Sequence, residues 1–184
     1  MPSLRLLRFL ALATAIGAWA VIVIGGYVSQ TESGLGCSEP ILCGPPTNPA
    51  NPTAAAIETT HRVAAWVEGL LVLSLLVLVL WRHRSWGPVR NLTLASFALV
   101  AAQAALGIMA VWTKLDSFVV TAHLGVATAF LAVSVLNAAT VFRGPPTAPS
   151  TAGAPSSPPG LAQPSALRGH SQSTRTGRPR AHSP

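Results

Sequence analysis

The chain of 184 residues is half apolar, has only 9% charged residues and has a mean hydropathy of +0.49. This composition excludes an ordinary soluble domain, and the long apolar runs exclude a disordered chain. A formal net charge of +7 would suit nucleic-acid binding. However, the basic residues stand at the ends of apolar runs and in the C-terminal segment. Membrane topology explains them better, and no nucleic-acid partner is expected.

Four apolar runs are long enough to cross a bilayer, since a spanning helix needs about 20 residues. We therefore predict an all-α membrane protein with a four-helix transmembrane bundle in residues 1–142. The first run resembles a signal peptide ending at Ala18-Trp19-Ala20, but its apolar stretch continues to Gly26, which favours a retained membrane anchor. The predicted helices cover approximately residues 6–28, 57–81, 92–112 and 118–142.

The positions of Lys and Arg predict the orientation of these helices, because cytoplasmic loops carry the excess of basic residues. Residues 29–56 contain no Lys or Arg, whereas arginines flank the other ends of the helices. We therefore expect both termini in the cytoplasm and residues 29–56 on the outer face of a bacterial cell membrane. A mitochondrial inner membrane is the less favoured alternative. The flanking arginines are Arg5, Arg8, Arg82, Arg84, Arg90 and Arg143.

The predicted outer loop, residues 29–56, contains both cysteines of the chain, Cys37 and Cys43. Prolines at positions 45, 46, 49 and 52 lead us to expect a folded cap without regular helix. In an oxidising compartment, two cysteines at this spacing can close a small ring, so a structural disulfide is favoured over free thiols. A redox-active pair is the alternative. A metal site is disfavoured because the loop contains no histidine.

Residues 143–184 are rich in Pro, Ser, Thr, Ala, Gly and Arg, and they contain no aromatic or acidic residue. Such a segment cannot bury a core, so a disordered cytoplasmic tail is predicted. The tail would be inert or would contact anionic lipid. A third interpretation is an unselected, frameshifted sequence, because the composition changes abruptly after Phe142.

Ionisable residues inside membrane helices are costly and are therefore candidates for function. Glu58 and His61 are three residues apart at the start of the second predicted helix, so they share one face. His123 lies about one and a half turns into the fourth helix. Because both helices run from outside to inside, His61 and His123 lie at similar depth. This pair suits two axial ligands of a haem iron, with interhelical hydrogen bonds as the alternative.

Other polar residues have predicted roles near this pair. Glu58 is a candidate catalytic group, either as a general base or as a stabiliser of positive charge, with helix capping as the alternative. Arg62 is predicted to bind a haem propionate or to anchor the helix at the interface. Glu68 should point nearly opposite to Glu58, toward a partner helix or a second subunit. Gln103 is predicted to make a polar contact in the interior.

Three glycines in the later helices, Gly69, Gly107 and Gly125, would allow helices or a flat ring to approach closely. Of the other histidines, His83 is expected to be solvated in a basic loop. His170 and His182 lie in the predicted tail and carry no argument for a site.

In chain order, GGYVSQTESGLGC, a second cysteine, IETTHR, QAALGIMAV and VVTAHLG resemble the haem A synthase family. The resemblance covers residues 25–137 and keeps the order of the motifs. It implies a membrane oxidoreductase that converts a methyl group of haem O to the formyl group of haem A. It also implies that His61 and His123 ligate the haem iron, that Glu58 acts in catalysis and that Cys37 pairs with Cys43.

The resemblance covers one of the two four-helix halves of a full-length member, whose second histidine pair is assigned to haem b. It implies haem O as substrate and haem A as product, with haem b as a further candidate ligand. Expected partners are membrane lipid, a second copy or a second-half subunit, and haem O synthase or terminal oxidase assembly. The alternatives are a non-enzymatic bis-histidine haem protein for electron transfer or haem delivery, and an inactive half of a split or frameshifted synthase.

Overall fold

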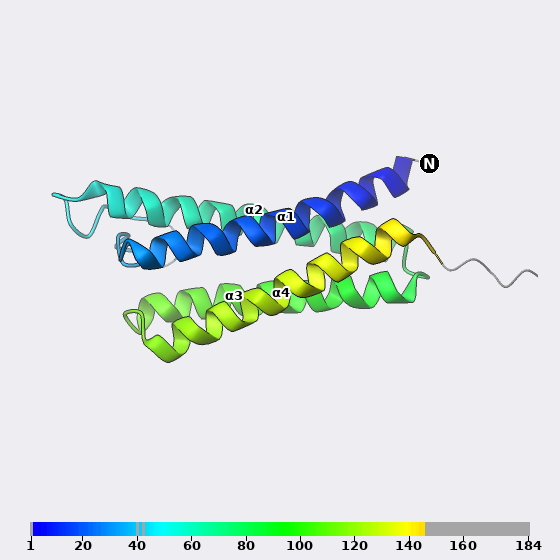
Figure 1. The fold of residues 1–184 in the computed structure, drawn as a ribbon. Helices are drawn as coiled ribbons and strands as arrows, with labels where there is room; N and C mark the ends of the chain where they lie inside the picture. The colour runs from blue at the N-terminus through cyan, green and yellow to red at the C-terminus, as the bar shows by residue number, and fades with distance from the viewer. Residues whose placement is uncertain (1, 40, 42, 146–184) are drawn as a thin grey trace, which may run out of the picture. The chain divides into compact units, whose positions relative to one another are not determined.

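The computed structural model describes residues 2–39, 41 and 43–145. In this part of the chain, four long helices are joined by short connections (Figure 1), and the only β-type pairing is an isolated bridge between Cys37 and Pro46. The predicted all-α, four-helix class is confirmed. The helices are α1 (Pro2–Gln30), α2 (Pro52–Arg82), α3 (Gly87–Trp112) and α4 (Ser117–Arg143).

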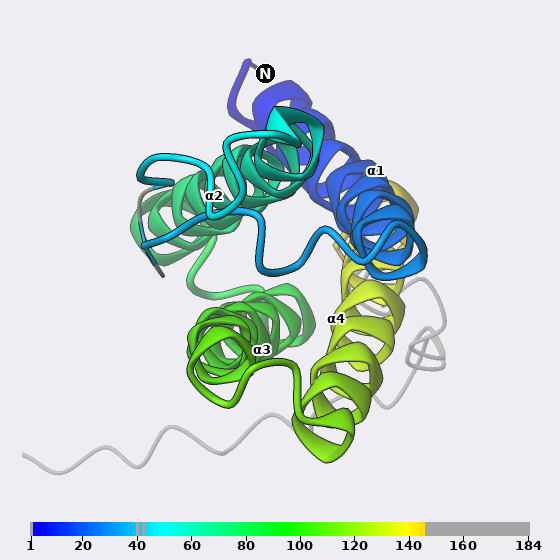
Figure 2. The same ribbon diagram turned by 90° about the vertical axis from the view of Figure 1, so that its left-hand side faces the viewer.

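The four helices form an antiparallel ring, seen end-on in Figure 2. Each helix packs against two neighbours in the order α1, α2, α3, α4 and back to α1. In the described residues, the diagonal pairs, α1 with α3 and α2 with α4, make no close backbone contact. The α1–α2 loop and the α3–α4 turn lie at one end, which we name the Cys-loop end. The opposite end holds the N-terminus and is named the N-terminal end.

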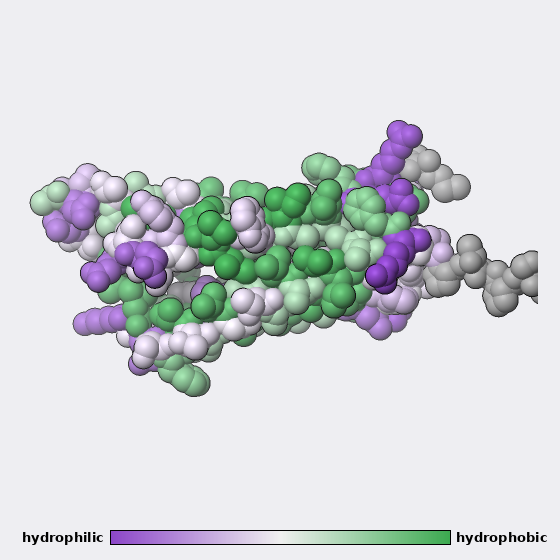
Figure 3. All heavy atoms as spheres, in the orientation of Figure 1, coloured by the Kyte–Doolittle hydropathy of each residue, from purple (hydrophilic) through white to green (hydrophobic). Residues whose placement is uncertain are grey.

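All four helices are long and apolar enough to cross a membrane. Large apolar side chains cover their outer sides, and Figure 3 shows a broad hydrophobic band between two polar ends. Exposed aromatic residues stand near both ends of the bundle, with Trp81 at the N-terminal end and Trp112 and Phe118 at the Cys-loop end. Such aromatic side chains are typical of the two membrane interfaces. The chain is a multi-pass membrane protein.

The apolar core is concentrated at the N-terminal end of the bundle. A large cluster there draws on all four helices, and a smaller cluster of Ala18, Val72 and Phe130 lies nearer the middle. The two clusters therefore occupy the N-terminal end and the middle of the bundle. Tight apolar packing therefore holds the end of the bundle that is farther from the predicted site. The large cluster consists of Leu7, Leu10, Ala11, Ala15, Leu75, Val79, Trp86, Val89, Ala138 and Val141.

The helices extend beyond the apolar runs that predict them. α2 begins at Pro52, because proline lacks an N–H and is tolerated in the first helical turn. The prediction that Pro52 excludes a helix is therefore wrong. α4 begins after Asp116, whose Oδ1 accepts hydrogen bonds from the N–H groups of Phe118 and Val119 at 3.0 and 3.2 Å. α4 ends at Arg143, and the predicted tail from residue 146 lies outside the described residues.

The connection between α2 and α3 is a tight turn around His83. The His83 N–H donates to the Val79 carbonyl, and the His83 carbonyl accepts from Trp86, each at 2.9 Å. Trp86 is buried in the core, and His83 is partly exposed, with its Nε2 buried and without a hydrogen-bond partner among the described residues. His83 is therefore less solvated than predicted, because one of its ring nitrogens is buried. His170 and His182 lie outside the described residues.

Candidate functional site

His61 and His123 lie on diagonally opposite helices, α2 and α4, near the Cys-loop end. Both side chains are half-buried. In each ring Nδ1 is buried and has no hydrogen-bond partner among the described residues. A satisfied interhelical hydrogen bond was the alternative role for these histidines, and at Nδ1 the structure contains none. In both imidazoles, Nδ1 therefore keeps its capacity to form a hydrogen bond or to bind a metal.

A glycine of a neighbouring helix lies beside each imidazole. A Cβ built on Gly25 of α1 would lie 2.9 Å from Cε1 of His61, and one on Gly107 of α3 would lie 3.6 Å from Cε1 of His123. The sequence predicts close approach at Gly107 but gives no such indication for Gly25. A Cβ on Gly69 or Gly125 would meet open space, so the predicted close approach at these two glycines is not found.

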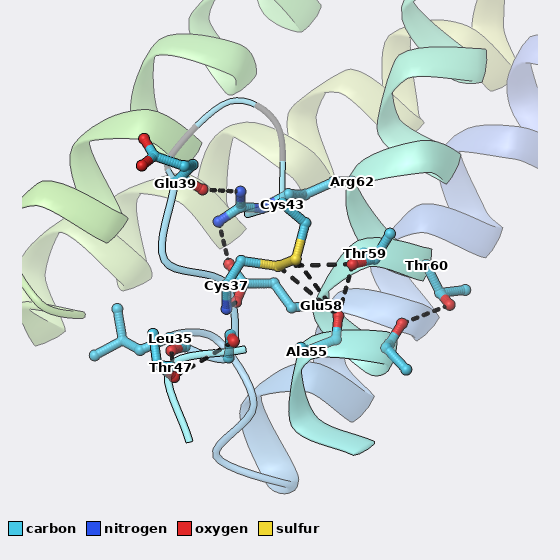
Figure 4. Close-up of a disulfide and its surroundings, with 12 residues drawn as sticks. Leu35, Cys37, Glu39, Cys43, Thr47, Ala55, Glu58, Thr59, Thr60 and Arg62 are labelled. Atoms are coloured by element: carbon cyan, nitrogen blue, oxygen red, sulfur yellow. Dashed lines mark hydrogen bonds and ion pairs between the residues drawn. A yellow bond between two sulfur atoms is a disulfide. The ribbon is translucent and has the colours of Figure 1, made fainter. Parts of the chain in front are cut away.

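Glu58 links α2 to the Cys-containing loop (Figure 4). It is 3% exposed, and its Oε2 accepts a hydrogen bond from the Cys37 N–H at 2.8 Å. Its Oε1 forms an ion pair with Arg62, which also donates to the carbonyl oxygen of Glu39. Glu58 lies beyond the first turn because α2 begins at Pro52. Helix capping, the alternative role of this carboxylate, therefore does not apply.

The arrangement changes the expectation for Arg62. Its side chain is largely buried and holds Glu58 and the loop together, rather than standing free at the interface. The guanidinium group carries five N–H donors, so these two contacts leave others unused. The sequence did not reveal this network, because the partners Cys37 and Glu58 are 21 residues apart and meet only when the loop folds onto α2.

Cys37 and Cys43 form a disulfide, as predicted, with their Cα atoms 4.9 Å apart. Both sulfur atoms lie near the carbonyl oxygen of Ala55, at 3.8 and 3.9 Å, and Cys37 Sγ lies 3.6 Å from Thr59 Oγ1. The bond therefore lies against the second turn of α2. Cys37 is 3% exposed, whereas Cys43 is only partly buried and lines a surface groove beside Arg62.

The loop backbone also contacts α2 directly at Gly36. A Cβ built there would lie 2.5 Å from the carbonyl carbon of Ala54 and 2.6 Å from the amide nitrogen of Ala55. Thr47 joins the two arms of the loop, donating from its N–H to the Gly36 carbonyl at 3.1 Å and from its hydroxyl to the Leu35 carbonyl at 2.8 Å. The loop is thus a folded cap, as expected, although α2 begins within the predicted range.

Glu68 is buried between helices and faces α1, where a Cβ on Gly17 would lie 3.1 Å from its Cδ. The prediction that Glu68 points nearly opposite to Glu58 is wrong. At 3.6 residues per turn, ten residues are close to three full turns, so the two side chains are about a quarter turn apart. Glu68 instead shares a face with His61, seven residues earlier, because seven residues make about two turns.

Gln103 makes the interhelical contact that was expected of a polar side chain in the interior. Its Nε2 donates to the backbone carbonyl of His123 at 2.8 Å, which ties α3 to α4 beside the second imidazole. Farther along the same interface, Asn137 donates to Thr93 at 2.9 Å, and both side chains are at most 1% exposed. These bonds hold the α3–α4 pair in register along its length.

Comparisons with known proteins place this geometry in context. A family model described as cytochrome oxidase assembly protein matches residues 8–167. The chain is similar to "Heme A synthase" of Lysinibacillus sphaericus, with 30% identity over 147 residues, 77% of this chain and 47% of the relative. It is also similar to "Heme A synthase" of Halalkalibacterium halodurans, with 32% identity over 154 residues, which are 79% of this chain and 50% of the relative. The "Heme A synthase" of Bacillus pumilus is 34% identical to the chain over 143 residues, which are 74% of this chain and 45% of that relative. The chain spans about half the length of these curated relatives.

Proposed function

The chain belongs to the cytochrome oxidase assembly protein family, and from this membership we propose that it is a membrane oxidoreductase of haem A synthesis. Its substrate is haem O, and its product is haem A, formed by oxidation of a ring methyl group to a formyl group. The relatives named heme A synthase support the reaction class. Because the chain spans about half their length, the reaction of the whole relatives is carried over to this chain only as part of the proposal.

The observation that carries the proposal is the pair of half-buried imidazoles on diagonally opposite helices. His61 and His123 each have a buried Nδ1 without a partner among the described residues. The described residues contain no group of three or more His, Cys, Asp or Glu side chains that would hold a bare metal ion. Two imidazoles suit an iron that has its other four ligands from a macrocycle. The donor chemistry of the site therefore fits a haem.

The surroundings of the two imidazoles also suit a flat apolar ligand. The apolar clusters of the described residues lie at the N-terminal end and in the middle of the bundle, and Gly25 and Gly107 place no side chain beside the two rings. A bound haem supplies a redox-active iron and the ring methyl group that is oxidised. His61 and His123 hold its iron, and the apolar helices receive its farnesyl chain. Arg62, through its unused N–H donors, binds a propionate.

Glu58 has two roles in this proposal. It anchors the loop through Cys37 and Arg62, and it places a carboxylate one turn from His61. From that position it handles a proton or stabilises positive charge that develops during oxidation. The contacts with Cys37 and Arg62 keep the carboxylate in one place, which is what a group acting on developing charge requires.

The test begins with the full chain, purified in detergent from cells that make haem O. Its absorption spectrum is recorded, and the bound haem is extracted and identified. We expect a low-spin bis-histidine spectrum with haem O or haem A, lost in His61→Ala and in His123→Ala. His83→Ala is the matched control, because His83 lies at the N-terminal end, and it should keep the spectrum. If the chain binds no haem, this half does not form the site alone.

The second candidate function is a non-enzymatic bis-histidine haem protein that transfers electrons or delivers haem. It is favoured by one observation, that both carboxyl oxygens of Glu58 already make structural contacts. Haem b as the only extracted haem would support it. Glu58→Gln separates the two functions further, because an amide oxygen can still accept from Cys37 while the charge is lost. A synthase should lose haem A production in this variant, whereas a carrier should keep its spectrum and function.

The proposed setting is a bacterial cell membrane with both termini in the cytoplasm and the Cys-loop end outside. A second copy of this chain and a separate second-half subunit are proposed as alternative protein partners. Lipid surrounds the exposed apolar side chains. Haem O synthase, as the supplier of substrate, and the assembly of a terminal oxidase, as the user of the product, are the further proposed partners.

A further inference from the structure

Glu68 is a second buried carboxyl group, deeper in α2 than the site described above. It is 3% exposed, and both of its carboxyl oxygens are buried without a hydrogen-bond partner among the described residues. Glu58, by contrast, uses both oxygens in contacts with Cys37 and Arg62. An ionised carboxylate without donors is costly in a membrane interior. The carboxyl group of Glu68 therefore needs a ligand that removes its charge.

Gly17 of α1 makes the space in which this carboxyl group lies. A Cβ built on Gly17 would overlap Oε2 of Glu68. The antiparallel register of α1 and α2 that sets Gly25 beside His61 also sets Gly17 beside Glu68, about two turns farther along both helices. Two glycines of α1 thus accommodate two ionisable side chains of α2. The space for the Glu68 carboxyl group is therefore formed by the packing of α1 against α2, and it does not depend on the side-chain rotamer alone.

No described basic side chain neutralises Glu68. The ion pair between Arg62 and Glu58 is the only salt bridge in the described part of the chain. On α1, Arg8 is nine residues from Gly17 and lies over the ring of Phe142, with its guanidinium carbon 5.7 Å from the ring centroid. Ala18, beside Gly17, and Val72, one turn beyond Glu68, are apolar and belong to the central cluster. Apart from Arg62, the nearest ionisable side chain of α2 toward the Cys-loop end is His61.

From this geometry we propose that Glu68 is a proton-binding site inside the membrane, where its carboxyl group is uncharged and reacts with apolar carbodiimides. The ligand of the site is a proton, and the reagent class that detects it is a hydrophobic carbodiimide. Glu68 shares a face of α2 with His61 at a distance of about 10 Å along the helix. The proton is thus held below the two imidazoles and away from the outer surface.

The labelling reaction between Glu68 and a carbodiimide depends on the proton that the carboxyl group holds. The carboxyl proton passes to one nitrogen of the carbodiimide, and the carboxyl oxygen bonds to the central carbon, which gives an O-acylisourea. The acyl group then moves to a nitrogen atom and forms a stable N-acylurea. The whole reagent is added, no group leaves and no electrons are transferred. The two carboxyl oxygens of Glu58 are occupied by Arg62 and the Cys37 N–H, and carboxylates exposed to water react with the water-soluble reagent instead.

The experiment treats the full wild-type chain in membranes with dicyclohexylcarbodiimide, and in parallel with a charged, water-soluble carbodiimide. Mass spectrometry of peptides then locates the adducts. We expect the apolar reagent to label Glu68 and the charged reagent to spare it, whereas the charged reagent labels the exposed Glu32 and Glu39. Equal labelling of Glu68 by both reagents would overturn the proposal. So would labelling of Glu68 only after the protein is unfolded.

Two variants make the test specific. Glu68→Gln should lose the adduct, together with an infrared carbonyl band of an uncharged carboxylic acid. Gly17→Ala fills the space beside the carboxyl group and should change the labelling rate, whereas the matched control Gly26→Ala adds a methyl group to open space on the same helix and should not. If Gly17→Ala and Gly26→Ala both label like the wild type, the site on α1 is wrong. These readouts need no bound haem, so they stand or fall separately from the proposed function.

Discussion

The imidazole of His61 lies in space that a glycine at position 25 leaves open. In Gly25→Ala, the new Cβ would lie 2.9 Å from Cε1, so the ring must move from its present place. We expect haem affinity to fall about tenfold, the effect of disturbing the support of a metal ligand. Titration of the purified chain with haem measures this, with Gly26→Ala as the control. Equal affinities of the two variants would show that Gly25 does not position the ring.

Glu58 also has a role in stability that can be measured apart from catalysis. Glu58→Ala removes the acceptor of the buried Cys37 N–H and the partner of Arg62, so we expect a loss of about 1–3 kcal/mol in the free energy of unfolding. Glu58→Gln should cost less, since its amide oxygen can still accept from Cys37. Thermal unfolding in detergent, with the disulfide left intact, compares the two variants. An Ala variant as stable as the wild type would contradict the anchoring role.

At the residue scale, the features that could be predicted are those that follow from helix geometry. His61 and His123 were identified because charged or metal-binding side chains are rare in membrane helices, and their matched depth follows from counting residues. The contact of Glu58 with Cys37 could not be found this way, because a loop of irregular backbone brings the two together. Gly17 and Gly25 were missed because their role depends on the register between α1 and α2, which no pattern within one helix reveals.

Among the structural elements, the Cys-containing loop is held to α2 by a close backbone contact at Gly36. In Gly36→Ala, the new Cβ would lie 2.5 Å from the Ala54 carbonyl carbon, and a backbone neighbour cannot rotate away as a side chain can. We expect the loop to shift from α2, at a cost of about 1–3 kcal/mol in stability. Because this shift uncovers Cys37, the disulfide should be reduced faster by dithiothreitol. Trapping of the released thiols measures the rate.

The control for this variant lies in the same loop. A Cβ on Gly34 would lie 3.2 Å from the end of the Leu115 side chain, which can adjust, and 3.7 Å from Cγ1 of Val28, which is an ordinary contact. Gly34→Ala should therefore keep the disulfide nearly as resistant to reduction as in the wild type. If both variants are reduced at the wild-type rate, the contact with Ala54 does not hold the loop, and the bonds from Glu58 and Arg62 hold it instead.

The helices as elements were predictable because a span of apolar residues long enough for a bilayer has few alternatives to a helix. The ends of the helices were less predictable, because the helical backbone hydrogen bonds continue past the last apolar residue of each run. α1 continues through Arg5 and Arg8 toward its start, where long basic side chains can reach the membrane surface. α2 gains its first turn from Pro52, a residue that was interpreted as a helix breaker but suits a helix start.

Across the described part of the molecule, apolar packing and polar contacts stabilise different ends of the bundle. The apolar clusters occupy the N-terminal end and the middle, whereas the Cys-loop end is held by the disulfide, the Glu58–Arg62 pair and backbone contacts. A bundle that is fixed at one end can keep space between its helices at the other without losing its fold. This division is consistent with two imidazoles without partners at Nδ1 in a helix bundle, and it places the proposed haem near the Cys-loop end.

The distribution of charged residues predicts the orientation of the molecule in the membrane, and this prediction can be tested directly. At the N-terminal end, arginines flank every helix end, whereas Lys114 is the only described Lys or Arg in a connection at the Cys-loop end, and Arg62 is paired with Glu58. Basic residues are retained in the cytoplasm, so the Cys-loop end should be outside. In intact cells, a membrane-impermeant maleimide should label Ser117→Cys, at the start of α4, and should label Ser85→Cys, between α2 and α3, only after the cells are permeabilised. Both positions are exposed, and the native cysteines are bonded to each other, so background labelling is low. The reverse pattern would place the imidazoles near the cytoplasmic face, where haem O would reach them from the opposite side.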